Sequence, residues 1–365
     1  MIKRCALLLT LFSVLLFGPM SSWPASAQPN VEQINVAAAR GRQWLLAHQH
    51  ANGSWGNAFA RRDTAEALSA FAGTNDTDAV IRARDWLVST DSVNTDYLAR
   101  KIRALNEIQA TPTDIQCLLE QQRPDGGFGL SQAYRSDPLD TALALQAIMG
   151  ASTGTIDSRR KSADFLASSR NPDGGWPLVW GGETHAMATA EAIIALAQYT
   201  KGQGNIALDE EIARAAVWLA SKQNPAGGWG EPADVVDTAL GVSALAAANR
   251  DVSARDRAVA YLLSAQAVDG SWNQDAYATV VALGALSSNK LNVSIFDGDV
   301  TASNPMPNAG ESLVISARVN NSGSMPVQDL TVRFYLGDPQ AGGQPLADSI
   351  IPDLPAGADH QVQYS

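Results

Sequence analysis

The sequence predicts a multidomain protein in which an all-α (α/α)6 toroid, a closed ring of six helical hairpins, precedes an all-β sandwich. Two observations carry this prediction. A short Gly-x-aromatic pattern recurs five times, always in the same register with the residues before it, and repetition of this kind indicates a repeat architecture. Near Lys290 the apolar residues change from helical spacing to alternation, which is typical of strands.

The first 27 residues have the composition of a secretory signal peptide. Two basic residues precede an apolar run from Ala6 to Phe17, and Ala25-Ser26-Ala27 fits a small-residue cleavage site. The apolar run is shorter than the roughly 18 residues that a membrane-spanning helix needs. We therefore expect a secreted protein, periplasmic or at the cell surface, with no integral membrane segment after cleavage.

Composition excludes several classes of partner. The leader holds two of the 26 basic residues, so the mature chain has 24 basic and 37 acidic residues and a negative net charge. Nucleic acid, anionic membranes and anionic sugars are therefore poor partners. Neutral glycans, small apolar molecules, proteins and cations remain open as ligands. Cys117 is the one cysteine left after cleavage, which excludes an internal disulfide and thiolate metal clusters.

The five turns share columns of aligned residues. The aromatic residues of the pattern are Trp55, Phe128, Trp176, Trp229 and Trp272. Six residues before them lie Gln49, Gln122, Arg170, Gln223 and Gln266. Eleven residues before them lie Trp44, Cys117, Phe165, Trp218 and Tyr261, each followed by leucine. Because the other four residues of this column are aromatic, we predict that Cys117 is a small buried hydrophobe. The spacing from Trp55 to Phe128 leaves room for a sixth, degenerate hairpin at Trp86-Leu87.

Each hairpin combines two kinds of helix. Before the turn, residues such as Ile212, Ala215 and Leu219 share one apolar face, which predicts an outer amphipathic helix. After the turn come helices rich in alanine and apolar on nearly all sides, at 65–71, 141–149, 189–196, 238–247 and 279–286. Helices that are apolar all round are buried. We therefore predict that they form the inner ring of a toroid over residues 28–289.

These residues resemble the repeat of squalene and oxidosqualene cyclases, in which a glutamine and a tryptophan tie each outer helix to the following turn. Prenyltransferase β subunits share the architecture, and the resemblance covers residues 31 to 289. It implies a toroid of the terpenoid-cyclase type. It implies little about activity, because one fold serves many functions.

Acidic residues gather at the predicted starts of the inner helices, which all lie at one rim of the ring. Directly before the first threonine lie Asp63, Asp140 and Asp237, which we interpret as helix N-caps and, alternatively, as ligand-binding candidates. Three residues before that column lie Asp137, His185, Asp234 and Asp275, which fall outside the predicted caps and are therefore candidate functional residues. Such oxygen ligands suit calcium. Beyond a calcium ion at this carboxylate rim, no cofactor or metal is predicted.

Two further features add polar groups to the ring. An insertion after the fourth turn supplies Trp180, Glu183 and His185. An aromatic residue with histidine and carboxylates can bind a sugar or act as a general base, although a surface histidine without function is the simpler interpretation. Glu66 and Glu191 occupy the same register in inner helices on opposite sides of the ring. A charge in an apolar helix needs water or a partner, so we expect a partly wet central cavity.

In squalene cyclases, the catalytic acid is the middle aspartate of an Asp-x-Asp-Asp-Thr-Ala motif at such a helix start. The matching stretches here are residues 137–142 and 234–239, and the acid position holds Leu139 and Val236. Neither side chain can protonate an alkene. The Asp-Asp-x-x-Asp run that holds magnesium diphosphate is also absent.

The second domain covers residues 290–365. Strands are predicted at 291–295, 313–319, 330–336 and 360–364, separated by Gly, Pro and Asn turns. The turn sequences at 320–323 and 354–357 resemble those of CARDB modules of bacterial surface proteins, which implies an immunoglobulin-like sandwich. Because the sequence ends inside a predicted strand, we expect the natural protein to continue beyond Ser365.

Two functional hypotheses follow. The first is a non-catalytic binding or adhesion platform, favoured by export, acidity, the lost acid and the surface-type module. The second is a toroid-family enzyme, either terpenoid cyclase-like or a glycan lyase or hydrolase, that uses the acidic rim and His185. A cavity with aromatic walls favours a cyclase, because such walls guide a carbocation. The inner helices instead supply alanine, leucine and valine.

Overall fold

The structure is a computed structural model of the 365-residue chain. It describes residues 31–71, 77–105, 112–150, 155–201, 205–288, 293–295, 299–304, 308, 311–321, 327–337, 343–355 and 358–365. The described residues up to Ser288 belong to one compact unit and those from Val293 belong to a second. The predicted signal peptide, residues 1–27, lies outside the described residues.

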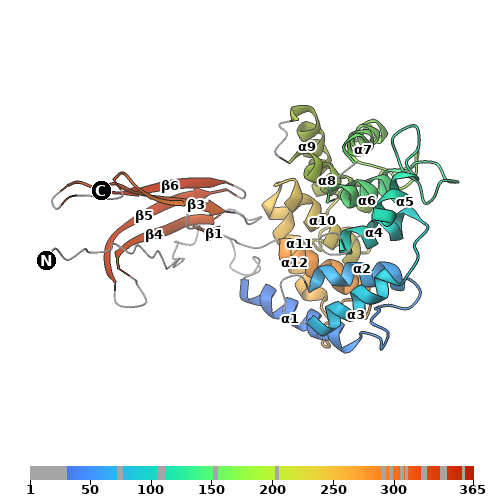
Figure 1. The fold of residues 1–365 in the computed structure, drawn as a ribbon, viewed down its shortest axis with the longest axis horizontal. Helices are drawn as coiled ribbons and strands as arrows, with labels where there is room; N and C mark the ends of the chain where they lie inside the picture. Colours follow the sequence, from blue (N-terminus) through green and yellow to red (C-terminus); the bar gives the residue numbers. More distant parts are fainter. Residues whose placement is uncertain are drawn as a thin grey trace. The chain divides into compact units, whose positions relative to one another are not determined.

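The first unit consists of two concentric sets of helices (Figure 1). The outer helices are α1 (Val31–Ala47), α3 (Thr77–Val88), α5 (Pro112–Leu119), α7 (Ile156–Ser169), α9 (Ile206–Ser221) and α11 (Val252–Ala265). The inner helices are α2 (Ala60–Ala70), α4 (Thr95–Leu105), α6 (Pro138–Met149), α8 (Ala186–Thr200), α10 (Val235–Ala247) and α12 (Ala276–Ser288). Each inner helix packs against the next, and α12 packs against α2. The ring therefore closes, and the predicted toroid of six hairpins is confirmed.

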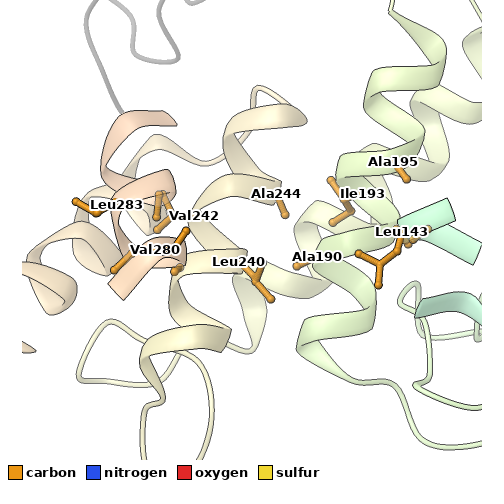
Figure 2. Packing of buried hydrophobic residues seen from close by; sticks show 14 of the residues in the cluster. Leu143, Ala190, Ile193, Ala195, Leu240, Val242, Ala244, Val280 and Leu283 are labelled. Carbon is orange, nitrogen blue, oxygen red and sulfur yellow. The ribbon is translucent and has the colours of Figure 1, made fainter. Parts of the chain in front are cut away.

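The inner helices are buried because their side chains are small or apolar on nearly every face. Figure 2 shows part of this core, including Leu143 of α6, Ala190 and Ile193 of α8, and Leu240 of α10. Alanine side chains let neighbouring helices approach closely, while leucine and isoleucine fill the space between them. Within the described residues, no helix is both long and apolar enough to span a membrane.

The inner helices begin earlier than the apolar pattern predicts, and their first backbone N–H groups are capped by side chains. Asp137 accepts a hydrogen bond from the backbone N–H of Asp140 at 2.9 Å. Asp234 caps α10 and Asp275 caps α12 in the same way, each through its Oδ1. His185 caps α8 through its ring nitrogen Nδ1.

The interpretation of Asp63, Asp140 and Asp237 as N-caps is therefore wrong. These residues lie inside the first helical turn, for the backbone N–H of Asp63 already bonds to the carbonyl oxygen of Phe59. An N-cap accepts hydrogen bonds from residues two or three positions further on. The polar residues of the first turn interrupt the apolar pattern, so the pattern starts about one turn after the helix itself.

Each turn is fastened to both helices of its hairpin. Trp229 is fully buried, and its Nε1–H donates to the carbonyl oxygen of Leu219 in α9 at 2.7 Å. The backbone N–H of Trp229 donates to Thr238 Oγ1 in α10 at 3.1 Å. The same pair of bonds is made by Trp55, Trp176 and Trp272. The tryptophan column is therefore structural, and the threonine column is its partner.

The glutamine column joins four of the hairpins to the next one, through Gln49, Gln122, Gln223 and Gln266. Gln223 Nε2 donates to the carbonyl oxygen of Gly227 in its own turn and to that of Ala254 in α11, at 2.7 and 2.8 Å. Gln266 does the same at the closure of the ring, where it donates to the carbonyl oxygen of Ala37 in α1 at 2.8 Å. This last bond connects the sixth hairpin to the first.

We expect Gln266→Ala to lower the free energy of unfolding by about 1–2 kcal/mol, because two hydrogen bonds at the ring closure are lost. Chemical denaturation followed by circular dichroism measures this change. Gln116→Ala removes an exposed glutamine of α5 and is the control, with an expected change within about 0.5 kcal/mol. Equal changes in the two variants would contradict a special role for the closure.

The second unit is an antiparallel β region. β3 (Ile315–Asn321) pairs with β6 (Asp359–Tyr364) on one side, and with β1 (Val293–Ser294) and β2 (Val300–Ala302) on the other. β4 (Val327–Leu336) and β5 (Gln344–Leu354) form a separate two-stranded sheet. Apolar residues of both sheets share one core. The region is antiparallel β structure, as the alternating pattern predicts.

β5 is the longest strand that the sequence does not predict. Pro345 and Pro352 lie within it, and its apolar residues alternate over only part of its length. Proline cannot donate a hydrogen bond to a neighbouring strand, so it is confined to edges and strand ends. The pairing of β5 with the strongly alternating β4 determines its structure more than its own sequence does.

Candidate functional site

The acidic residues at the rim form separate groups instead of one continuous ring. The groups are Asp137 with Asp140 and Asp96, Asp234 with Asp237 and His185, and Asp275 with Asp63 and Arg62. In the part of the chain that the structure describes, no three His, Cys, Asp or Glu side chains are placed to hold a metal ion. The geometry therefore gives the predicted calcium site no support.

Asp140, in the first turn of α6, has the most perturbed carboxyl group of the rim. Burial, and next the charge of Asp137 with which it shares a hydrogen bond, raise the pKa of Asp140 to about 8. The residue is 8% exposed. Two carboxyl groups at hydrogen-bonding distance do not both ionise readily, so they hold one proton between them. Asp140 therefore carries a proton at neutral pH and can act as a general acid.

The acids at the same register in α2 and α10, Asp63 and Asp237, also have raised pKa values. Burial raises the pKa of Asp63, against the lowering effect of the adjacent Arg62, whose guanidinium lies 2.8 Å from the carboxylate. Burial also raises the pKa of Asp237, while His185 lowers it and Asp234 raises it. The buried first turn thus favours the neutral form of the acid in three inner helices.

Charged side chains also converge in the centre of the ring. Arg100 of α4 bonds to Glu66 of α2 at 2.6 Å and to Asp96 at 2.5 Å. Its guanidinium carbon lies 5.6 Å from the ring centroid of Tyr277 in α12. Because α2 lies between α4 and α12 in the ring, this contact joins two inner helices that are not direct neighbours. Arg62 stacks over the same tyrosine ring at 4.0 Å.

The two glutamates predicted to share this region both have protein partners. Burial opposes ionisation of Glu66, but the positive charges of Arg103 and Arg100 outweigh burial and lower its pKa. Glu191 is 3% exposed and accepts a hydrogen bond from Gln146 Nε2 of α6 at 2.8 Å. The centre of the toroid is therefore a polar, hydrogen-bonded cluster.

Sequence reasoning did not find Arg100, Tyr277 or Gln146. Arg100 lies in the degenerate hairpin, which lacks the Gly-x-aromatic turn that sets the register in the others. The available signal was an arginine among the buried apolar residues Leu98 and Ile102, the same signal that identified Glu66. Burial then raises the pKa of Tyr277 to about 12, so this phenol remains neutral beside the guanidinium groups.

A groove lies beside the insertion of the fourth hairpin. It has a volume of about 720 Å³, and Glu183, His185 and Asp237 are among its lining residues. His185 Nδ1 accepts a hydrogen bond from the backbone N–H of Met187 at 3.2 Å. The neutral imidazole therefore carries its proton on Nε2, which makes that nitrogen a hydrogen-bond donor. The structure brings these three candidates together.

Two other predicted residues have surroundings that the sequence did not indicate. Trp180 does not line this groove; it packs against Phe165, with ring centroids 5.8 Å apart, and is 54% exposed. Cys117 is exposed, so its interpretation as a buried hydrophobe is wrong. A large aromatic side chain such as that of Trp44 is buried because it packs against a turn. The small side chain of Cys117 at the same position of its hairpin remains exposed.

A ring of six hairpins closed by glutamine and tryptophan contacts defines the terpenoid-cyclase type of toroid. Residues 75–282 match the family described as squalene-hopene cyclase C-terminal domain, and the chain belongs to this family. It is 31% identical over 169 residues to a drimenyl diphosphate synthase of Streptomyces showdoensis, an alignment that covers 42% of this chain and 30% of the relative. The chain spans well under half the length of the curated relatives it matches.

Solved structures share the fold of the helical unit. The type II terpene cyclase MstE from Scytonema superposes with a TM-score of 0.57 at 15% identity, covering 70% of this chain and 98% of MstE. An α-1,6-mannanase of Salegentibacter superposes with a TM-score of 0.55 at 9% identity, covering 69% of this chain and 98% of the mannanase. At these identities, the similarity concerns the fold alone.

Proposed function

We propose that the protein is a toroid-family enzyme of the terpenoid-cyclase kind, in which Asp140 donates a proton to an oxygen atom of an isoprenoid ligand at the mouth of the ring. The Asp137–Asp140 pair is the observation that carries this proposal. It places a protonated carboxyl group in the first turn of an inner helix, next to the lumen residues Arg100 and Asp96. A general acid works best when its pKa is near the pH at which it operates.

The chemistry of this acid determines the substrate class. A carbon–carbon double bond is a very weak base, so its protonation requires a strong acid, and Asp140 holds its proton too firmly for that step. The positions matching the acid of squalene cyclases are Leu139 and Val236. The oxygen of an epoxide can instead accept the proton while its strained C–O bond breaks, and the electrons of a neighbouring double bond of the isoprenoid, or water, form the new bond to that carbon. We therefore propose an oxygenated isoprenoid as substrate, handled without a cofactor.

The polar lumen is consistent with this class of ligand. The cluster of Arg100, Glu66 and Tyr277 offers hydrogen-bonding groups that a pure hydrocarbon leaves unused. The cations of the cluster are compensated by carboxylates, so the lumen does not provide the excess positive charge that a diphosphate group needs.

Incubation with a terminal isoprenoid epoxide, and with the same isoprenoid lacking the oxygen, tests the proposal by mass spectrometry of the products. We expect turnover of the epoxide alone, and a loss of about 100-fold or more in Asp140→Asn. Asp237→Asn changes the residue at the same register in α10 and is expected to keep most of the turnover. Equal losses in both variants, or turnover of the alkene, would show that the assignment of Asp140 is wrong.

A second candidate is a non-catalytic binding or adhesion platform. The observation that favours it is the replacement of the cyclase acid by Leu139 and Val236. In the same epoxide experiment, this candidate predicts thermal stabilisation by the ligand, equal in the parent and in Asp140→Asn, with no product. A ligand that binds the native state raises the melting temperature by mass action.

Either function fits export, which we propose from the leader at residues 1–27. We further propose that the β region is a CARDB-like, immunoglobulin-like module that displays the toroid in the periplasm or at the cell surface. The shared core of its two sheets supports this proposal.

A further inference from the structure

The groove of the fourth hairpin has the size and lining of a small-molecule site. It lies between the turn after α7 and the outer helix α9, and Trp218, Asp173 and Lys222 line it together with Glu183, His185 and Asp237. Its volume of about 720 Å³ is within the range of ligand pockets, which combine an aromatic surface with a few polar groups. These groups are not part of the Asp137–Asp140 pair.

Trp218 is held in a fixed orientation before any ligand binds. Its Nε1–H donates to Asp173 Oδ2 at 2.9 Å. Asp173 is itself fixed, because Oδ1 accepts a hydrogen bond from Thr184 Oγ1 at 2.8 Å. The indole is half-buried and lines the groove. An aromatic side chain that is already immobilised loses little conformational entropy on binding.

The polar groups of the groove include both donors and acceptors. His185 offers an N–H at Nε2, since Nδ1 is engaged in capping α8. Glu183 is exposed on the insertion and offers carboxylate oxygens, and Asp237 lines the groove from the first turn of α10. Hydroxyl groups can pair with each of these atoms. The carboxylates outnumber Lys222, the one lysine lining the groove, so anionic ligands are disfavoured.

An equivalent groove elsewhere in the ring shows what is particular to this one. Between the sixth turn and α1 lies a groove of about 400 Å³ lined by Trp44, the counterpart of Trp218. There His48 stacks on the indole, with ring centroids 4.1 Å apart and planes at 18°. The residue at the position of His48 in the fourth groove is Lys222, whose Nζ lies 5.5 Å from the indole centroid. A stacked imidazole thus covers the aromatic face in the sixth groove, whereas in the fourth groove the flexible side chain of Lys222 lies over the face and has to move aside for a ligand.

We propose that the groove of the fourth hairpin binds a neutral saccharide, with the apolar face of one sugar ring on Trp218 and its hydroxyl groups on Glu183, His185 and Asp237. A pyranose has an apolar face and a rim of hydroxyl groups, which matches an indole surrounded by mixed donors and acceptors. The site is independent of catalysis at Asp140, so either proposal can fail without the other.

Saturation-transfer NMR and isothermal titration of the full chain with maltose, cellobiose and mannobiose test this site. We expect at least one disaccharide to bind the parent, and Trp218→Ala to weaken that affinity by about tenfold or more. Trp44→Ala removes the counterpart at the sixth groove and is expected to leave the affinity unchanged. Trp218→Phe keeps an aromatic face and is expected to bind more tightly than Trp218→Ala.

Glu183→Ala distinguishes a lost sugar contact from misfolding. Because Glu183 is exposed, its loss should weaken sugar binding without changing the melting temperature. The proposal is overturned if none of the three disaccharides binds the parent, or if Trp218→Ala and Glu183→Ala bind as the parent does. It is also overturned if tetramethylammonium binds the groove while the sugars fail to displace it, since the groove is then a cation site.

Discussion

Asp140→Asn is expected to stabilise the toroid increasingly as the pH rises, and to have little effect in acid. The folded pKa of Asp140 is about 8, well above its ordinary value of 3.8. Between these two values the folded state binds a proton that the unfolded state has released, so the parent loses stability as the pH rises through this window. The asparagine does not titrate. The difference should approach the order of 3–5 kcal/mol once the parent's carboxyl group has ionised.

Denaturation with urea from about pH 4 to about pH 9 measures this difference. Asp164→Asn removes an exposed surface carboxylate of α7 and is the matched control, for which we expect the slope of the parent. The pKa values of Asp63, Asp137 and Asp237 are also raised by burial, so Asp140→Asn should remove only part of the pH dependence. Parallel curves for the parent and Asp140→Asn would mean that Asp140 is ionised in the native protein.

Arg100→Met is expected to destabilise the toroid by about 3–5 kcal/mol, because it removes the guanidinium that bonds to both Glu66 and Asp96 in the centre of the ring. The Arg100 side chain is 8% exposed and that of Glu66 is 11% exposed. Methionine fills a similar volume, so the loss should come from the weaker compensation of these two carboxylates, of which Glu66 keeps Arg103 at 3.8 Å. Thermal and chemical unfolding measure the change, which should diminish at low pH as Glu66 takes up a proton.

The double variant Arg100→Met with Glu66→Gln separates charge from packing. It should recover much of the stability, because replacing a whole buried pair by neutral groups costs little, whereas leaving one charge alone costs much. Arg160→Met removes an arginine that pairs with Asp157 and Asp164 at the surface, and we expect little change in stability because exposed ion pairs are screened by solvent. If the double variant is no more stable than Arg100→Met, lost packing is the cause.

The parts of the fold that the sequence predicts well are those in which one local requirement recurs. A buried Trp229 needs an acceptor for its indole N–H, and Gln223 bridges its turn to the next outer helix, so both residues recur at fixed spacing in most hairpins. These bonds connect residues close in the sequence or one hairpin apart. The register of the toroid can therefore be predicted from the spacing of tryptophan and glutamine alone.

The candidate site was predicted less well because its important contacts are not local. Arg100 and Tyr277 meet on either side of α2 although 177 positions separate them in the chain, and no periodicity reveals such a meeting. The roles of Asp137 and Asp140 were exchanged for a different reason. Both are acids near a helix start, and only the observed hydrogen bond distinguishes the half-buried cap from the buried first-turn acid.

The bond from Gln266 to Ala37 closes the ring across 229 residues, so that every hairpin has a neighbour on both sides. Each outer helix begins where the preceding inner helix ends, so α12 ends and α1 begins at the same face of the toroid. Elsewhere this step is short, as from Ala247 to Val252. The toroid therefore does not depend on which hairpin comes first in the chain. A circularly permuted chain, opened at Asn249 and joined from α12 to α1, is expected to retain the contacts between helices that define the toroid.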